Sequence, residues 1–402
     1  MRAHSPEQRA AALVSLCFTM AVMAWGIVFY GHSFYLQSLT ALGRFSTAEV
    51  SGAIGFSFWC GIPAGIVAGR MLTRYPPFRV IAFGVCTIAA ALLLLPAADG
   101  YLLLYLAFAL FGIGYPCLST TGISGTLNYY LRERYATRLS MALTGASVGG
   151  AAMVPVLVWL RDTSGLATTL LLVAVVMALV LLPFGFALAR QPAVVASSPS
   201  TPGPRIRPAA LLRSRVFLAI TVSGACMLGG QVAFLSHQVP LLSTYLDDSS
   251  AAFGVSITAG TAVAGRFLAG ALAERFDVAR LCMCAAAVQA AGMCMLYAAT
   301  TPLGLFAGSA VGGFVVGAIV MLPPLLVRAR FGSERYSEIY GYTNVGLYLG
   351  AGLGPVALGW LREADGDYSR GLMLIVAAQV AAVLALLAAN RRDCAPAGIS
   401  PV

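Results

Sequence analysis

Apolar stretches long enough to cross a lipid bilayer recur along the whole 402-residue chain. A helix needs about 20 apolar residues to span roughly 30 Å of hydrocarbon. Charged residues make up 10% of the chain, whereas a soluble domain carries about 25%. The stretches are continuous and do not alternate with period two, so they predict membrane-spanning helices and exclude a barrel.

We place twelve spans in the sequence, and a Pro- and Ser-rich segment separates the sixth from the seventh. The expected spans are 10–36, 47–69, 78–97, 100–128, 138–160, 166–189, 215–243, 251–273, 278–299, 302–327, 336–361 and 370–389. The segment predicts a flexible linker at 191–213 between a six-helix bundle at 1–190 and another at 214–402. The first span is too long for a signal peptide and lacks a small-x-small cleavage site, so we expect it to be retained.

The arginines predict the orientation of the chain in the membrane. All 25 basic residues are arginine, and with the N-terminus inside, twenty fall in cytoplasmic segments and four in outer loops. This bias predicts a multi-pass inner-membrane protein with both termini cytoplasmic. The arginines are divided among many short loops, which favours contact with anionic membrane lipid and excludes nucleic acid as a partner.

The two halves of the sequence repeat each other at a constant offset. Trp159-Leu-Arg-Asp162 matches Trp360-Leu-Arg-Glu363 at a distance of 201 residues. The same offset relates Gly112 to Gly313 and Gly145 to Gly346. Because each half holds an even number of spans, we expect an all-α membrane protein of two parallel six-helix pseudo-repeats, an arrangement used by transporters that rock two bundles about a midplane site.

Loops after the second and eighth spans resemble the signature of the major facilitator superfamily, which is close to G-x-x-x-D-R-x-G-R-R. The copy at 270–280 keeps an acid at Glu274, whereas the copy at 69–79 has Thr73 in its place. The resemblance implies the major facilitator fold and a loop that ties helix ends together in one conformational state. The residues that would form this lock are Glu274, Arg275, Arg280 and Arg74.

Within that superfamily, four stretches resemble bacterial monocarboxylate transporter-like and oxalate–formate antiporter-like members. They are Thr47 to Ser51, Thr144 to Pro155, Gly265 to Gly270, and Gly354 to Tyr368. The resemblance implies transport of a small carboxylate, by proton-coupled symport or by anion exchange. The expected partners are therefore a small-molecule carboxylate, membrane lipid, and protons where transport is coupled to them.

One arginine, Arg266, lies deep within a predicted span. It precedes Glu274 by eight residues, which corresponds to ~12 Å along a helix. A charge at that depth marks a functional site by default, and a guanidinium can bind a carboxylate through paired hydrogen bonds. The position matches the carboxylate-binding arginine of the families named above. Some relatives have an acid one turn earlier, where this chain has Ala262, or a lysine in the first or eleventh helix, and this chain has no lysine.

Several polar side chains in the spans are further candidates for substrate binding. His32 and His237 can donate hydrogen bonds to an anion or carry a proton near neutral pH, although a lone membrane histidine often only bonds a neighbouring helix. The remaining candidates lie in spans one, four and eleven: Tyr30, Tyr35, Tyr115, Asn344 and Tyr348, with Tyr342 beside them. These aromatic residues are equally well explained as packing or interfacial groups.

The sequence contains neither a phosphate-binding G-x-x-x-x-G-K-[ST] motif nor HExxH, and it shows no convincing metal cluster. We therefore expect no enzyme activity, no cofactor and no metal. The leading interpretation is a secondary carrier for a monocarboxylate-like anion. The alternatives are an exporter of drugs or other amphipathic solutes, which would favour an acid in the cavity, and a non-transporting solute sensor on the same fold.

Overall fold

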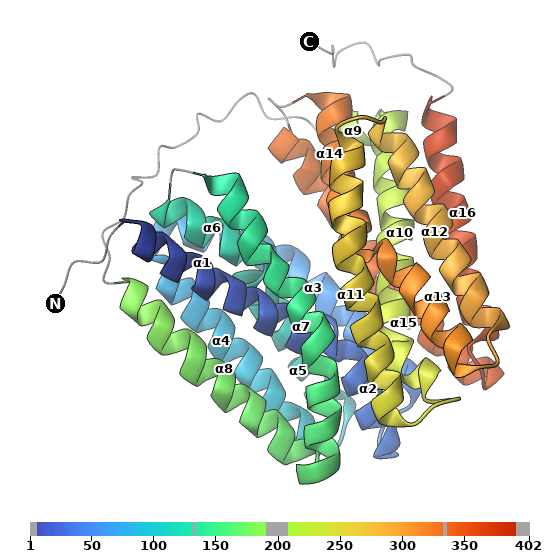
Figure 1. Ribbon diagram of the computed structural model, residues 1–402, viewed down its shortest axis with the longest axis horizontal. Coiled ribbons are helices and arrows are strands. Elements are labelled where there is room, and N and C mark those ends of the chain that lie inside the picture. Colours follow the sequence, from blue (N-terminus) through green and yellow to red (C-terminus); the bar gives the residue numbers. More distant parts are fainter. Residues whose placement is uncertain (1–5, 132–133, 190–207, 333–335, 391–402) are drawn as a thin grey trace. The chain divides into compact units, whose positions relative to one another are not determined.

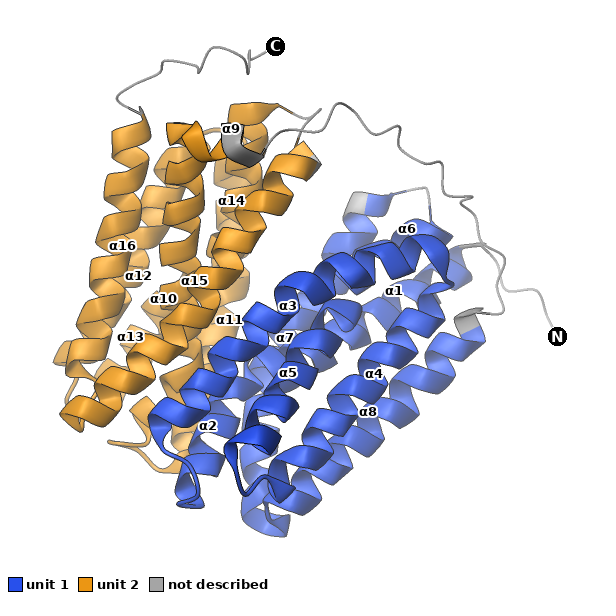
Figure 2. Cartoon of the chain, turned by 180° about the vertical axis from the view of Figure 1, so that it is seen from behind, with its two compact units in different colours: residues 1–200 blue, residues 201–402 orange. Residues whose placement is uncertain are grey.

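The computed structural model describes residues 6–131, 134–189, 208–332 and 336–390. The chain divides into two compact units, Met1–Ser200 (unit 1) and Thr201–Val402 (unit 2), which Figure 2 shows in blue and orange. The expected linker at 191–213 lies outside the described residues as far as 207, and α9 (Pro208–Arg213) follows.

Unit 1 is built from helices that hold the first six spans (Figure 1). Their bounds are α1 (Pro6–Met23), η1 (Ala24–Phe29), α2 (Gly31–Ala41), α3 (Thr47–Arg74), α4 (Pro77–Leu94), η2 (Leu95–Ala97), α5 (Tyr101–Leu118), α6 (Thr120–Tyr130), α7 (Tyr135–Ser164) and α8 (Leu166–Ala189). Helix α3 begins at a capping box, because the Ser46 side chain accepts the Glu49 N–H and the Glu49 carboxylate accepts the Ser46 N–H.

Unit 2 holds the other six spans. Besides α9, its helices are α10 (Arg215–Leu242), α11 (Asp248–Ala273), α12 (Val278–Ala298), α13 (Pro302–Phe314), α14 (Val316–Phe331), α15 (Tyr336–Asp365) and α16 (Ser369–Asn390). Asp247 caps α11 by accepting the Ser250 N–H at 3.0 Å. Hydrogen bonds from the side chain and backbone of Ser250 hold the pKa of Asp247 below its usual range.

The described part of the chain contains twelve helices long and apolar enough to cross a membrane, which confirms the predicted spans. Three spans are interrupted, which the sequence analysis did not anticipate. The first contains the π-helix η1, in which the Tyr30 N–H donates to the Trp25 carbonyl at 2.8 Å. The fourth breaks at Ser119 and the tenth at Val315.

Matching helix contacts confirm the repeat between the units. In unit 1, Gly112 of α5 lies against the backbone of Ser57 in α3. In unit 2, Gly313 of α13 lies against the backbone of Thr258 in α11, so both partners are shifted by 201 residues. A side chain at either glycine would collide with the neighbouring backbone. The shared glycines therefore record the same close helix crossing in each half.

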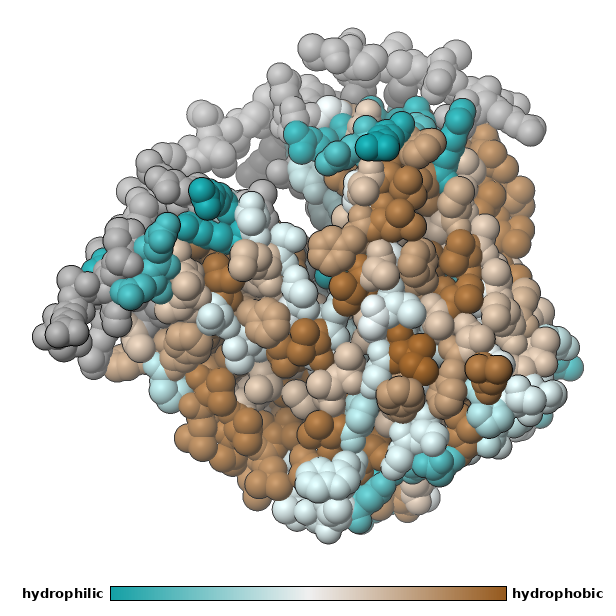
Figure 3. Space-filling model, in the orientation of Figure 1, coloured by the Kyte–Doolittle hydropathy of each residue, from teal (hydrophilic) through white to brown (hydrophobic). Residues whose placement is uncertain are grey.

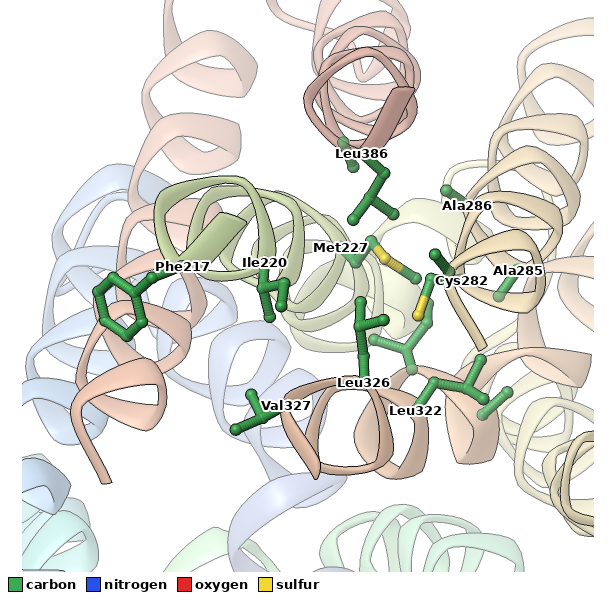
Figure 4. Packing of buried hydrophobic residues seen from close by; sticks show 14 of the residues in the cluster. Phe217, Ile220, Met227, Cys282, Ala285, Ala286, Leu322, Leu326, Val327 and Leu386 are labelled. Atoms are coloured by element: carbon green, nitrogen blue, oxygen red, sulfur yellow. The ribbon is translucent and has the colours of Figure 1, made fainter. Parts of the chain in front are cut away.

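The interior of unit 2 is a cluster of apolar side chains around Met227 of α10 (Figure 4). Residues of α12, α14 and α16, including Cys282, Leu322 and Leu386, complete it. Large apolar side chains also lie on the outside of both units, among them Leu179 and Leu303, which are 68% and 78% exposed. Figure 3 shows apolar surface along the helices and hydrophilic residues near their ends, as expected for helices in hydrocarbon.

Candidate functional site

The intramembrane arginine of unit 2 lies seven residues before the end of α11 at Ala273, which is ~10 Å along the helix. Arg266 is partly exposed, and it interacts with other groups of the chain. The lack of an acid in the sequence around it therefore does not leave it without a partner.

Helix α14 packs directly against the Arg266 side chain. A methyl group on Gly317 would lie 2.8 Å from Arg266 Cβ and 3.1 Å from its Nε. It would also come within 2.7 Å of the Ala262 carbonyl oxygen, one turn earlier in α11. Since carbon atoms normally pack at about 3.5–4.0 Å, a side chain at this position would force its neighbours to shift. The Arg266 side chain therefore passes close to Gly317 at the start of α14.

The candidate histidine of unit 2, His237, belongs to a buried hydrogen-bonding network. His237 of α10 is 1% exposed, and its Nδ1 lies 3.3 Å from the hydroxyl of Tyr368. Its Nε2 lies 3.3 Å from the Pro355 carbonyl oxygen in α15. Arg362 lies over the Tyr368 ring at 5.1 Å, and burial raises the pKa of the Tyr368 hydroxyl while Arg362 opposes the shift. His237 thus joins α10 to α15 through Nε2 and to the connection between α15 and α16 through Nδ1.

The other histidine, in unit 1, has different surroundings. His32 of α2 is 2% exposed, and within the described residues neither ring nitrogen has a hydrogen-bond partner. Its ring packs against Phe58 of α3 at 5.5 Å and is stacked on Phe108 of α5 at 6.1 Å. It follows the π-helix η1, a type of segment that is often found at functional sites.

The three candidate tyrosines of unit 1 lie in or beside the same aromatic region. Tyr35 is buried, stacks on Phe111 at 5.2 Å, and donates its hydroxyl to the Ile27 carbonyl in η1 at 2.9 Å. Tyr115 makes an edge contact with Trp25 of η1 at 5.5 Å. The buried Tyr30 ring fits against Gly150 of α7. The structure therefore groups His32, Tyr35 and Tyr115 with η1, α3 and α5.

The candidates of span eleven lie on α15 of unit 2. Asn344 and Tyr348 are partly exposed, and Tyr342 is 38% exposed. They remain proposed binding residues on the same unit.

The expected lock loop shows an ion pair that the sequence analysis did not identify. Asp277 caps α12 and lies 3.8 Å from Arg330 at the end of α14. Glu274, Arg275 and Arg280 are exposed, as is Arg74 in unit 1. Within the described residues, the ion pair of this loop is therefore formed by Asp277.

Sequence reasoning also missed the buried amides of unit 2. Gln238 donates to the Gly254 carbonyl at 3.1 Å and to the Thr258 hydroxyl at 2.7 Å, and Thr258 in turn donates to Ser309. Gln231 and Gln289 are also buried, and within the described residues their amide groups have no hydrogen-bond partner. A glutamine inside an apolar span is visible in sequence, but whether it is bonded depends on neighbouring helices.

The arrangement in unit 2 offers a cation and hydrogen-bonding groups, which suits binding of an anion without covalent chemistry. Among the described residues, no group of three or more His, Cys, Asp or Glu side chains is placed to hold a metal ion.

Nearly the whole sequence matches one family of membrane transporters. The sequence profile of the Major Facilitator Superfamily matches residues 10–355 and, in a second match, residues 236–396. Together these matches cover nearly all of the described chain.

Curated relatives include transporters of two kinds. Monocarboxylate transporter 13 of Bos taurus is 26% identical over 380 residues, covering 93% of this chain and 88% of the relative. Monocarboxylate transporter 11 of Homo sapiens is 28% identical over 337 residues, covering 77% and 68%. The agnestins efflux protein AgnL12 of Paecilomyces divaricatus is 24% identical over 312 residues, covering 77% and 70%.

Solved transporters share the fold. A point mutant of the nucleoside transporter NupG superimposes with a TM-score of 0.77 at 14% identity, covering 95% of this chain and 99% of that one. A bacterial homologue of the human lysosomal transporter Spinster, inward-facing and occupied, gives a TM-score of 0.69 at 16% identity, covering 98% and 100%. At these identities the likeness concerns the fold alone.

Proposed function

This chain belongs to the major facilitator superfamily and is a multi-pass membrane transporter, and we propose that it carries a small monocarboxylate by alternating access. The observation that carries the proposal is Arg266, an arginine inside a membrane span that is partly exposed and packed along α14. A guanidinium binds a carboxylate through two parallel hydrogen bonds, which favours planar monoanions. Relatives named monocarboxylate transporters, similar over most of their length, support this substrate class.

The proposal assigns the other candidates supporting roles. His32, Tyr30, Tyr35 and Tyr115 would shape unit 1, and His237, Asn344 and Tyr348 would shape unit 2. Glu274, Arg275, Arg280 and Arg74 would act in the loops that stabilise one conformational state. The protein would reside in the inner membrane with both termini cytoplasmic, in contact with lipid, and would work by proton-coupled symport or anion exchange.

Thermal stabilisation of the purified protein by a panel of carboxylates tests the proposal. We expect short monocarboxylates to raise the Tm of the wild type, because a ligand that binds only the folded state stabilises it. Arg266→Gln should weaken binding roughly 10- to 100-fold, the range for losing a charge-assisted hydrogen-bonding partner. Arg70→Gln, at an exposed arginine of α3, is the matched control. A wild type that responds to no carboxylate would remove the proposal.

Uptake into proteoliposomes decides the coupling. Symport predicts uptake driven by a proton gradient with no internal anion present. Exchange predicts uptake that requires internal carboxylate and is indifferent to the gradient.

Efflux of a larger amphipathic solute is the second candidate, because an efflux protein is among the relatives. It predicts stabilisation by amphipathic compounds that persists in Arg266→Gln. The two candidates therefore differ in their dependence on a single side chain.

A further inference from the structure

The helix facing Arg266 bears a glycine at the point of closest approach. Gly317 is the second residue of α14, and its Cα faces the turn of α11 between Ala262 and Arg266. The groups nearest to a methyl placed there are the Ala262 carbonyl oxygen at 2.7 Å, Arg266 Cβ at 2.8 Å and Arg266 Nε at 3.1 Å. The absent side chain leaves the space along which the arginine extends.

The same region contains the interruption of the tenth span. Helix α13 ends at Phe314 and α14 begins at Val316. Gly265, the residue before Arg266, lies directly against the Phe314 carbonyl. Two glycines, one on each helix, therefore bring the backbones of the tenth span and of α11 into contact in the turn that ends at Arg266. The arginine is held where the tenth span is divided into two helices.

We propose that Gly317 is a positioning residue for Arg266, and that it sets the affinity of the transporter for carboxylates by leaving room for the arginine to lie along α14. This inference rests on the proposed function. Nε is the guanidinium nitrogen nearest the backbone, so a methyl group 3.1 Å away acts on the planar group itself. Bidentate recognition of a carboxylate requires that plane to be fixed, because both hydrogen bonds depend on its orientation.

The proposal also accounts for glycine at a helical position. Glycine lowers the stability of a helix relative to alanine. Here the contact with α11 requires it. By contrast, Gly260 of α11 has no neighbouring group within 4 Å of its missing Cβ, and alanine would fit there.

Carboxylate binding by Gly317→Ala, measured as thermal stabilisation of the full-length protein, tests the inference, with Gly260→Ala as the matched control. We expect Gly317→Ala to weaken the binding of the monocarboxylate that stabilises the wild type best by roughly tenfold, since a small misplacement of a binding group has effects of this size or larger. Gly260→Ala should bind as the wild type does. An unchanged affinity in Gly317→Ala would overturn the inference.

The double variant Arg266→Gln/Gly317→Ala separates positioning from a general loss of structure. If Gly317 acts through Arg266, adding Gly317→Ala to Arg266→Gln should not reduce the residual affinity further. A further tenfold loss would show that Gly317 acts by another route and would overturn the inference. If Gly317→Ala does not fold, the double variant Arg266→Ala/Gly317→Ala decides the inference. It should fold as Arg266→Ala does, because the guanidinium that the methyl group displaces is gone; a double variant that still fails to fold would show that Gly317 serves the backbone contact with Ala262 and would overturn the inference. Failure of the proposed function is distinct, because the wild type would then bind no carboxylate.

Discussion

The two units share their helix contacts but differ in the polar groups that they bury. Gly149 of α7 lies against Val22 of α1, and Gly350 of α15 lies against Ala225 of α10, so the first and fifth spans of each unit meet through glycine. Unit 1 surrounds its buried histidine with aromatic rings. Unit 2 buries four glutamines, whereas none is fully buried among the described residues of unit 1.

The two units therefore share the constraint of close helix contacts and differ in their buried polar groups. Close backbone contacts tolerate no side chain, so the glycines persist in both units. The buried polar side chains, in contrast, differ between the two units. The partly exposed arginine within a span also belongs to unit 2. We therefore expect anion recognition to depend on unit 2 more than on unit 1.

The largest expected effect is a loss of stability when the glycine between the first and fifth spans of either unit is replaced. Gly149→Val and Gly350→Val should each destabilise the protein by about 3 kcal/mol, because the new side chain meets backbone that cannot move aside. Gly341→Val, on the same helix as Gly350 but with no neighbour within 4 Å, is the control. Thermal unfolding measures the effect. A large loss in one unit and none in the other would break the equivalence of the two halves.

The two histidines should respond in opposite directions to the same substitution. His237→Phe should lower the free energy of unfolding by about 1–2 kcal/mol, because it removes the hydrogen bonds of His237 to the Tyr368 hydroxyl and the Pro355 carbonyl. His32→Phe should raise it by about 1 kcal/mol, because two buried nitrogens without partners in the described chain are replaced by apolar carbon. Equal losses in both variants would show that His32 is bonded in the folded protein.

Within unit 2, two buried glutamines should likewise respond differently when each is replaced by an apolar side chain. Gln238→Met should destabilise by about 1 kcal/mol, since its amide bonds Gly254 and Thr258. Gln289→Met should be neutral or stabilising by up to about 1 kcal/mol, since its amide has no partner among the described residues. Unfolding measurements on both variants in the same detergent provide the comparison. A destabilised Gln289→Met would indicate that its amide hydrogen-bonds to water or a ligand.

The smallest expected effect on stability comes from removing an ion pair at the helix ends of unit 2. Arg330→Gln removes the Asp277–Arg330 ion pair, in which the side chains are 46% and 28% exposed. Such pairs contribute about 0–1 kcal/mol, and salt screens them. We expect a slight drop in Tm at low salt that disappears at high salt. In unit 1, Thr73 instead bonds the Arg70 carbonyl of its own helix, so Thr73→Ala should show no salt dependence.

Much of the fold could be predicted from the sequence, whereas little of the site geometry could. Apolar runs alone gave the number of spans, but the breaks at η1, Ser119 and Val315 were not predicted. Hydropathy is averaged over a whole span and does not respond to one displaced hydrogen bond. Arg266 was identified because a charge in an apolar run is visible without coordinates, but its contact with Gly317 was not.

The sequence by itself determined that this chain spans a membrane many times and that its halves repeat, and it placed Arg266 deep within a predicted span. These conclusions rest on residue type and spacing, which are properties of the chain alone. Only the tertiary structure decided that His237 is bonded while His32 lacks a partner among the described residues, and that α14 makes room for Arg266 at a glycine. Those outcomes depend on which helices meet and at what level, and residues far apart in the sequence settle them together.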